Sequence, residues 1–270
     1  SWGIYAQRYN ADGSPFGEEF RAHSYTANSQ EFPTVSMAPN GDYIIAWHEL
    51  DHNTGSPHDW ANNWGTYAQR YTWNAPNGGL FQILDAHHSD SQFAKIVLNS
   101  QGYLAIVNWQ TNYGTNLRFF TPEGDRSDVI ISTHSPGVYD GHDIALTDDG
   151  KVILAYSKRS VLGDTQDTAI LAQIFDVVSG QATSEAFRVN QTTTGHQTQP
   201  SIGLYSDGQF LIAWQGYGSG DEDGIYARRY HADGSPQTSE FRVNSVTDGS
   251  QNRPDVAISQ SDRHHVIVWN

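Results

Sequence analysis

The stretch GIYAQRY at residues 3–9 returns as GTYAQRY at residues 65–71 and as GIYARRY at residues 224–230. A seven-residue phrase that recurs twice in 270 residues indicates an internal repeat. It belongs to a longer unit, which adds a Gly/Pro turn, an apolar stretch that usually follows proline, a tight Gly-containing turn and a second apolar stretch that usually ends in tryptophan. Two divergent copies fill the middle of the chain, so five copies of about 54 residues account for its whole length.

Each copy holds four short apolar or alternating runs that are bounded by turn residues, with no helical periodicity between them. This pattern predicts an all-β fold, a five-bladed β-propeller of four-stranded blades that spans residues 1–270 as one domain. A β-solenoid would also repeat, but its coils are usually shorter. Because the chain begins at a third strand and ends at a second, we expect strands 2–9 and 18–22 to pair with strands 254–259 and 264–269. That pairing would close the ring and remove a free sheet edge.

The composition limits the partners of the chain. A formal net charge of −15 repels phosphate backbones, which argues against nucleic acid. No apolar run approaches the ~18 residues that cross a bilayer, so we expect no membrane insertion. The absence of cysteine excludes disulfides, thiol catalysis and Cys-ligated zinc. The same features favour a secreted or cell-surface protein, either a monomer or a module of a larger chain.

The loops predict which end of the propeller carries the site. We label the strands of a blade A to D from the centre outward. The A–B and C–D connections are short turns, whereas the B–C and D–A connections, at the opposite end, differ from copy to copy and hold most of the 12 histidines. Since framework residues repeat and functional residues break the repetition, we expect the site at the B–C/D–A end, near the mouth of the central channel.

Polar and aromatic side chains at this end are candidates for binding sugars. Trp60 occurs in a loop of the first copy only and could stack on a sugar ring, or simply pin its own loop. Polar side chains at the ends of the strands could form hydrogen bonds with the hydroxyl groups of a sugar. They could equally line a channel that holds only water. The predicted ligand-binding residues are His48, Asp59, Trp60, Gln110, His142 and Gln215.

Carboxylate catalysis at the same end is the main alternative. Glycosidases need two carboxyl groups about 5 to 9.5 Å apart. Glu49, Asp51, Asp143 and Asp255 could approach the channel mouth, and the last two share one position at the start of strand A. A lyase that uses His48 or His142 with Tyr139 is a further possibility. The sequence assigns no catalytic pair among these residues.

A calcium site is a weaker prediction. Asp51, Asp221 and Asp223 offer the hard oxygen ligands that calcium prefers, without the full spacing of a known calcium loop. Solvated acidic loops explain the same residues. No motif for a transition metal such as HExxH is present.

The unit GIYAQRYNADGSP…EFRVN…DG…AW resembles repeats of large exported bacterial proteins, including adhesin-like and RTX-associated ones. The similarity spans the chain, most strongly in the first, fourth and fifth copies, and implies a surface-displayed interaction module. The five-bladed count is also similar to propeller lectins and to furanosidase-type glycoside hydrolases. We therefore predict an extracellular, lectin-like module that binds a glycan without transforming it. The alternatives are a polysaccharide hydrolase or lyase, and a protein-binding scaffold.

Overall fold

The computed structural model of the chain describes residues 2–23, 29–50, 64–76, 81–84, 95–110, 114–124, 126–131, 141–159, 168–259 and 261–270. The regular elements of these residues are β-strands, and neighbours within each sheet pair antiparallel. The described residues form no helix long and apolar enough to span a membrane.

Four four-stranded sheets follow one another, each with its strands in chain order, and we call them blades 1 to 4. Blade 1 holds β3 (Gln30–Met37), β4 (Tyr43–Leu50), β5 (Trp64–Tyr71) and β6 (Phe81–Leu84). Blade 2 holds β7 (Lys95–Leu98), β8 (Leu104–Gln110), β9 (Gly114–Phe120) and β10 (Arg126–Ile131). Blade 3 holds β11 (His142–Leu146), β12 (Lys151–Arg159), β13 (Thr168–Asp176) and β14 (Phe187–Arg188). Blade 4 holds β15 (Gln197–Leu204), β16 (Phe210–Gly218), β17 (Asp221–Tyr230) and β18 (Phe241–Arg242).

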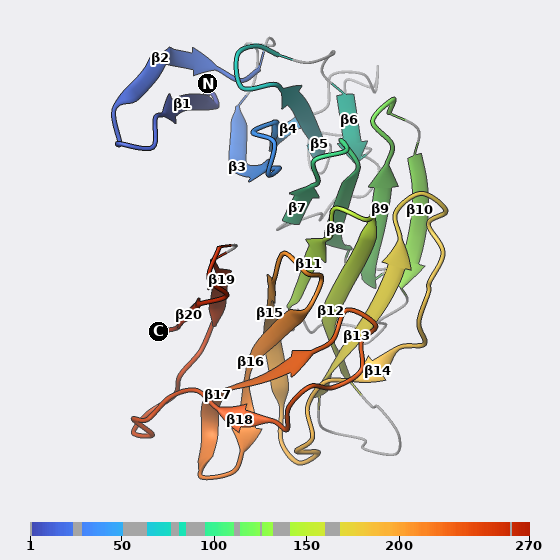
Figure 1. The fold of residues 1–270 in the computed structure, drawn as a ribbon, viewed down its shortest axis with the longest axis vertical. Coiled ribbons are helices and arrows are strands. Elements are labelled where there is room, and N and C mark those ends of the chain that lie inside the picture. Colours follow the sequence, from blue (N-terminus) through green and yellow to red (C-terminus); the bar gives the residue numbers. More distant parts are fainter. Residues whose placement is uncertain are drawn as a thin grey trace.

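The ends of the chain form two smaller sheets. The N-terminal half-blade pairs β1 (Tyr5–Tyr9) with β2 (Pro15–Arg21), and the C-terminal half-blade pairs β19 (Asp255–Ile258) with β20 (His265–Val268). Figure 1 shows the blades arranged around a central space, with β3, β7, β11, β15 and β19 innermost. The all-β propeller architecture expected from the repeat is confirmed at this level.

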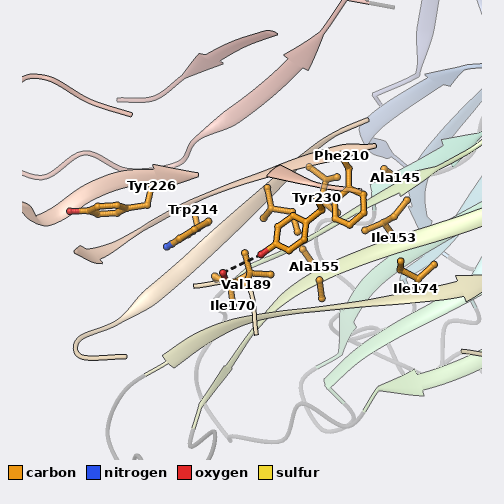
Figure 2. Packing of buried hydrophobic residues seen from close by; sticks show 13 residues of the cluster. Ala145, Ile153, Ala155, Ile170, Ile174, Val189, Phe210, Trp214, Tyr226 and Tyr230 are labelled. Carbon is orange, nitrogen blue, oxygen red and sulfur yellow. Dashed lines mark hydrogen bonds between the residues drawn. The ribbon is translucent and has the colours of Figure 1, made fainter. Parts of the chain in front are cut away.

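The core lies between successive blades, where the face of one sheet packs on the next. In Figure 2, Phe210 and Tyr230 of blade 4 lie against apolar residues of blade 3, and Trp214 and Tyr226 extend the same cluster. The Tyr230 hydroxyl donates to the Val189 carbonyl at 3.1 Å. In blade 1, the equivalent Tyr71 hydroxyl donates to the Ala22 carbonyl, which lies in the preceding half-blade. The final tyrosine of the repeated phrase is therefore a structural residue that ties a blade to the one before it.

The repeated tryptophans are structural in the same way. Trp47 and Trp214 are 0 % exposed. Each still satisfies its indole N–H, which donates to Glu49 Oε2 at 3.0 Å in blade 1 and to Gln197 Oε1 at 2.9 Å in blade 4. A buried indole with a hydrogen-bond partner leaves no unsatisfied donor in the core, which is consistent with tryptophan recurring at this position.

The expected ring closure is not present in this structure. Among the described residues, β1 pairs only with β2 and β19 only with β20, so strands 2–9 and 18–22 do not pair with strands 254–259 and 264–269. The physical reason is that each half-blade has a different neighbour. The N-terminal half-blade buries Ile4 and Ala22 on blade 1, whereas the C-terminal half-blade packs Val256 and Ile267 on blade 4.

The opening between the two half-blades leaves apolar side chains in water. We call it the seam, and its exposed residues come from β1, from β3, and from β20 and the residue after it: Tyr5, Tyr9, Val35, Met37, Val266, Val268 and Trp269. The residues of β15 that correspond to Val35 and Met37 are Ile202 and Leu204, which pack against blade 3. The seam therefore exposes the type of surface that the other blades bury.

Candidate functional site

The site is built from one position of the repeat, near the start of the regular pairing of strand A with strand B. This position is occupied by Lys95, Asp143, Ser201 and Asp255 in successive repeats, each three residues before the last residue of its innermost strand. Because the innermost strands line the central space (Figure 1), these polar residues lie at one level around it. We call them the axial cluster. They lie towards the B–C/D–A end that the loops predict.

Direct contacts join the axial cluster from blade to blade. Lys95 Nζ lies 2.6 Å from Asp143 Oδ1, and the other oxygen, Oδ2, accepts the Ile202 backbone N–H at 2.8 Å. Ser201 Oγ then donates to Asp255 Oδ1 at 3.3 Å and accepts the Val256 N–H at 3.1 Å. One network of charges and hydrogen bonds thus crosses blades 2, 3 and 4 and the C-terminal half-blade.

The two carboxyl groups of the cluster lie in opposite environments. Asp143 is 2 % exposed, and burial raises its pKa, against the opposing effects of the Lys95 ammonium and of two backbone N–H donors. Asp255, in contrast, is exposed to water. The Lys95 side chain is 46 % exposed, so the cluster opens to solvent on the Lys95 side. A buried and an exposed carboxyl group in one site are the usual basis of separate acid and base roles.

The hydrogen bonds also limit the distance between these carboxyl groups. Asp143 Oδ2 is 2.8 Å from Ile202 N, and Asp255 Oδ1 is 3.3 Å from Ser201 Oγ. Since a serine Oγ and the next backbone nitrogen are roughly 3 to 3.7 Å apart, the two carboxyl groups lie within about 10 Å of each other. That limit includes the separations at which glycosidase carboxyl groups work.

His48 and Glu49 lie at the end of β4, and both are buried. Burial lowers the pKa of His48, whose ring lies 5.8 Å from that of Phe32 in an edge-on arrangement. Glu49 is 0 % exposed and accepts the Trp47 indole. This bond ties Glu49 to the buried Trp47 of blade 1.

The other predicted site residues are placed as follows. His142 is half-buried at the start of β11, immediately before Asp143. Gln215 donates from Nε2 to Asp223 Oδ1 at 3.0 Å. Gln110 ends β8 opposite Gly114, and its side chain lies outside the described part of the structure. Asp51, Asp59, Trp60 and Tyr139 also lie outside the described residues.

The proposed calcium ligands that are described already have partners within the protein. Asp221 Oδ2 accepts Asn244 Nδ2 at 2.7 Å, and Asp221 Oδ1 accepts the Asp223 N–H at 3.1 Å. Within the described ranges, no three His, Cys, Asp or Glu residues cluster in a way that could hold a metal ion. Calcium therefore stays a prediction from the sequence.

A cavity of about 580 Å³ lies elsewhere, between the N-terminal half-blade and blade 1. Its walls include Arg8, Phe20, Tyr43 and Tyr71, and the two tyrosine rings stack at 4.8 Å. Burial raises the pKa of Tyr71 to about 12. A stacked pair at the same repeat positions, Phe210 and Tyr230, recurs in blade 4, so these two tyrosines are framework residues and the axial cluster is the better candidate site.

Lys95 and Ser201 are members of the cluster that sequence reasoning missed. Both can be found by counting back three residues from the end of strand A, just before the tight A–B turn. Alignment on the strand-B tryptophan hides Lys95, because Trp109 comes one residue late relative to Trp214. Asn108 lies at the Trp214 position instead.

No protein-family model and no curated protein sequence matches the chain. Solved structures do resemble it. One is a protein of unknown function from Dyadobacter fermentans, with a TM-score of 0.56 and 12% identity over 89% of this chain and 74% of that one. Another is an α-L-arabinanase from Penicillium chrysogenum complexed with arabinobiose, with a TM-score of 0.51 and 14% identity over 88% of this chain and 74% of that one.

A third is an α-L-arabinofuranosidase from Fusarium graminearum in complex with an iminosugar inhibitor. Its TM-score is 0.54, with 11% identity over 87% of this chain and 74% of that one. At these identities the likeness concerns the fold. It nevertheless corrects the prediction of a glycan-binding module without catalysis, because two of these three neighbours are named as carbohydrate-cleaving enzymes. The alternative, a polysaccharide-active enzyme, accounts better for these findings.

Proposed function

We propose that the chain is a glycoside hydrolase whose reaction takes place at the axial cluster. One observation carries this proposal. Two carboxyl groups on innermost strands that flank β15, Asp143 on β11 and Asp255 on β19, lie within about 10 Å of each other, one buried and one exposed. Such a pair can provide an acid and a base on the two sides of one glycosidic bond.

The environments suggest which carboxyl group takes which role. Burial favours the protonated form of Asp143, which donates its proton to the glycosidic oxygen as the bond from that oxygen to the anomeric carbon breaks. Asp255 accepts a proton from the water that attacks the anomeric carbon. Solvent then returns the proton to Asp143 and removes the other from Asp255. Lys95 is a positioning residue, since it orients Asp143 Oδ1 and marks the open side by which a sugar approaches.

Arabinose-containing glycans are the first substrates to test. Two structural neighbours are named for activity on α-L-arabinose linkages, and one of them is complexed with arabinobiose. The similarity of the repeats to exported bacterial proteins supports an extracellular setting, where plant polysaccharides would be encountered. Binding of a glycan is part of this proposal.

The test is hydrolysis of linear arabinan, measured as new reducing ends and released oligosaccharides. We expect Asp143→Asn and Asp255→Asn to lower kcat by about 10²- to 10⁴-fold, the usual contribution of a general acid or base. Asp148→Asn is the matched control, because Asp148 lies in the A–B turn of the same blade, beyond the other end of β11. Equal activity of all three variants, or no cleavage of any arabinose-containing glycan by the wild type, would contradict the proposal.

We also propose that the two half-blades can pair to form a fifth blade and close the ring. Their exposed apolar residues support this state, because β3 presents Val35 and Met37 to the seam while β20 presents Val266 and Val268. Burial of half-exposed aliphatic side chains of this kind stabilises by about 1 kcal/mol each. Closure would also join the exposed edges of β1 and β20, which removes an aggregation risk.

A further inference from the structure

The cavity between the N-terminal half-blade and blade 1 lies apart from the axial cluster, which spans blades 2 to 4 and the C-terminal half-blade. We call it the half-blade cavity. Residues of β1, β2, β4, β5 and the turn after β5 line it. Its volume of about 580 Å³ is within the range of pockets that bind small molecules.

The equivalent interface between blades 3 and 4 is crossed by an arginine that the half-blade cavity lacks. Arg228 corresponds to Gln69, because each lies two residues before the last tyrosine of the repeated phrase. The Arg228 guanidinium donates from Nη1 to the Val189 carbonyl at 3.2 Å and from Nε to the Thr238 carbonyl at 3.0 Å. Gln69 has a shorter side chain, whose amide donates to the adjacent Arg70 carbonyl at 2.9 Å. The shorter residue leaves space at this interface.

A charged residue also replaces an apolar one at this interface. Arg8 corresponds to Ile174 of blade 3, since each precedes the last aromatic residue of its third strand. Ile174 packs against the C–D turn of blade 4, where a Cβ added to Gly234 would lie 3.2 Å from the Ile174 Cδ1. Arg8 instead donates from Nη1 to the Trp73 carbonyl in the corresponding turn of blade 1. The half-blade cavity is therefore bordered by a guanidinium where blade 3 presents a methyl group.

The Arg8 guanidinium is half-buried and forms no ion pair with a described carboxyl group. Its Nε is buried without a hydrogen-bond partner in the described part of the chain, and its charge lies 5.1 Å from the Phe16 ring and 5.6 Å from the Phe20 ring. Arg21, on the same cavity wall, donates from Nε to the His23 carbonyl at 3.1 Å. A partly buried guanidinium is stabilised by an anion, and its planar donors suit a carboxylate.

The arginines of the half-blade cavity stand out in a chain of the opposite charge. Arg8 and Arg21 both line the cavity, while Glu18 on the same wall is exposed to water, which screens its charge. The whole chain carries 15 basic and 30 acidic residues. Two arginines at one cavity, neither in an ion pair with a described carboxyl group, therefore favour an anionic ligand.

The other walls suit a ring that carries hydroxyl groups. Phe20 is half-buried and offers an apolar surface, on which the C–H face of a sugar can pack. Asn74 and Glu18 are exposed and can form hydrogen bonds with hydroxyl groups. Aromatic surface with a few convergent polar groups is typical of sites for small ligands. Together with the two arginines, these features favour a sugar that carries a carboxylate.

We propose that the half-blade cavity binds a hexuronic acid unit, which combines a pyranose ring with a carboxylate. The carboxylate faces Arg8 and Arg21, and the ring packs on Phe20. Because the ligand touches both the N-terminal half-blade and blade 1, its binding should raise the melting temperature. The site is separate from the axial cluster, so binding there requires no cleavage.

The test is isothermal titration with methyl glucuronide and methyl galacturonide, compared with methyl glucoside and methyl galactoside, which lack the carboxylate. We expect saturable binding of at least one uronide, about tenfold or more tighter than its neutral counterpart and weaker at higher salt. Arg8→Ile and Arg21→Ala should each raise its Kd by about tenfold or more. Arg70→Ile and Arg188→Ala are the matched controls and should retain the wild-type Kd, since they lie at the same repeat positions in blades 1 and 3.

Three results would overturn the inference. The first is absence of uronide binding by the wild type, and the second is equal binding of the neutral glycosides. The third is equal weakening by the control variants, which would mean that the ligand does not depend on the half-blade cavity. Arg21→Ala decides the matter if Arg8→Ile fails to fold, because Arg21 is exposed. None of these results bears on cleavage of arabinan at the axial cluster.

Discussion

Closure of the seam can be captured with one engineered cross-link. In blade 4, Ala213 pairs with Ala227 between the second and third strands. The corresponding residues of the half-blades are Val268 and Ala6, so a closed fifth blade would place them directly opposite each other. Paired residues on antiparallel strands have Cα atoms about 4.5 to 5.5 Å apart, which lies within the range of a disulfide.

The double variant Ala6→Cys and Val268→Cys should therefore oxidise to an intramolecular disulfide. The chain has no other cysteine that could compete. The bond would close a loop of roughly 260 residues, for which chain entropy gives a stabilisation of about 5.6 kcal/mol. Guanidinium unfolding of the oxidised and reduced forms measures this difference, and intact mass spectrometry detects the loss of two hydrogens.

The control is Ala6→Cys with Ile267→Cys. Ile267 packs on blade 4, so its side chain points to the opposite face of β20 from Val268, and we expect no cross-link. If the Ala6–Val268 variant kept free thiols, or joined only different molecules, the seam would not close as a fifth blade. Equal cross-linking of both variants would show that the half-blades meet without a defined register.

Three further predictions concern single residues. Burial raises the pKa of Asp143 above the ordinary aspartate value of 3.8, so the folded state retains a proton that the unfolded state releases. The free energy of unfolding should therefore fall as the pH rises from 3.8 through the raised pKa. Urea unfolding should show this loss in the wild type but not in Asp143→Asn. Burial lowers the pKa of His48, so stability should fall as the pH drops below 6.5, and thermal unfolding of His48→Gln should lack that loss. Trp214→Ala should lower the free energy of unfolding by about 3 to 5 kcal/mol in denaturant, since it removes a fully buried aromatic side chain. A decrease below about 1 kcal/mol would mean that the packing of the blades does not depend on this residue.

The repeat alone predicts most of the strands, because turns and apolar runs are local features. It also predicts the structural role of Trp47, Trp214 and the phrase-ending tyrosines, since residues that pack between blades must recur. Pairing of the half-blades does not follow from the repeat in the same way. It depends on how the two ends of the ring meet, and each end already has a neighbour to pack against.

The candidate site was only partly visible in the sequence. Asp143 and Asp255 share a repeat position that sequence reasoning noticed, whereas Lys95 was hidden by the extra residue before Trp109. The sequence also offered Glu49 as a carboxyl group that could approach the channel mouth, and it could not show that Glu49 is buried and bonded to the Trp47 indole. The left-handed backbone of Phe32 and Gln199 was hidden by local chemistry, since Phe-Pro and Gln-Pro are normally extended and β-bulges on β3 and β15 accompany the left-handed conformation.

The most direct test of the proposed acid and base roles compares two substrates with different leaving groups. Arabinan needs protonation of its leaving oxygen, whereas 4-nitrophenyl α-L-arabinofuranoside releases a phenolate that needs little help. If Asp143 is the acid and Asp255 the base, Asp143→Asn will lose activity on arabinan but retain most of it on the aryl glycoside, while Asp255→Asn will lose both. Equal losses of Asp143→Asn on the two substrates, or full activity of either variant on arabinan, would contradict catalysis by the axial cluster.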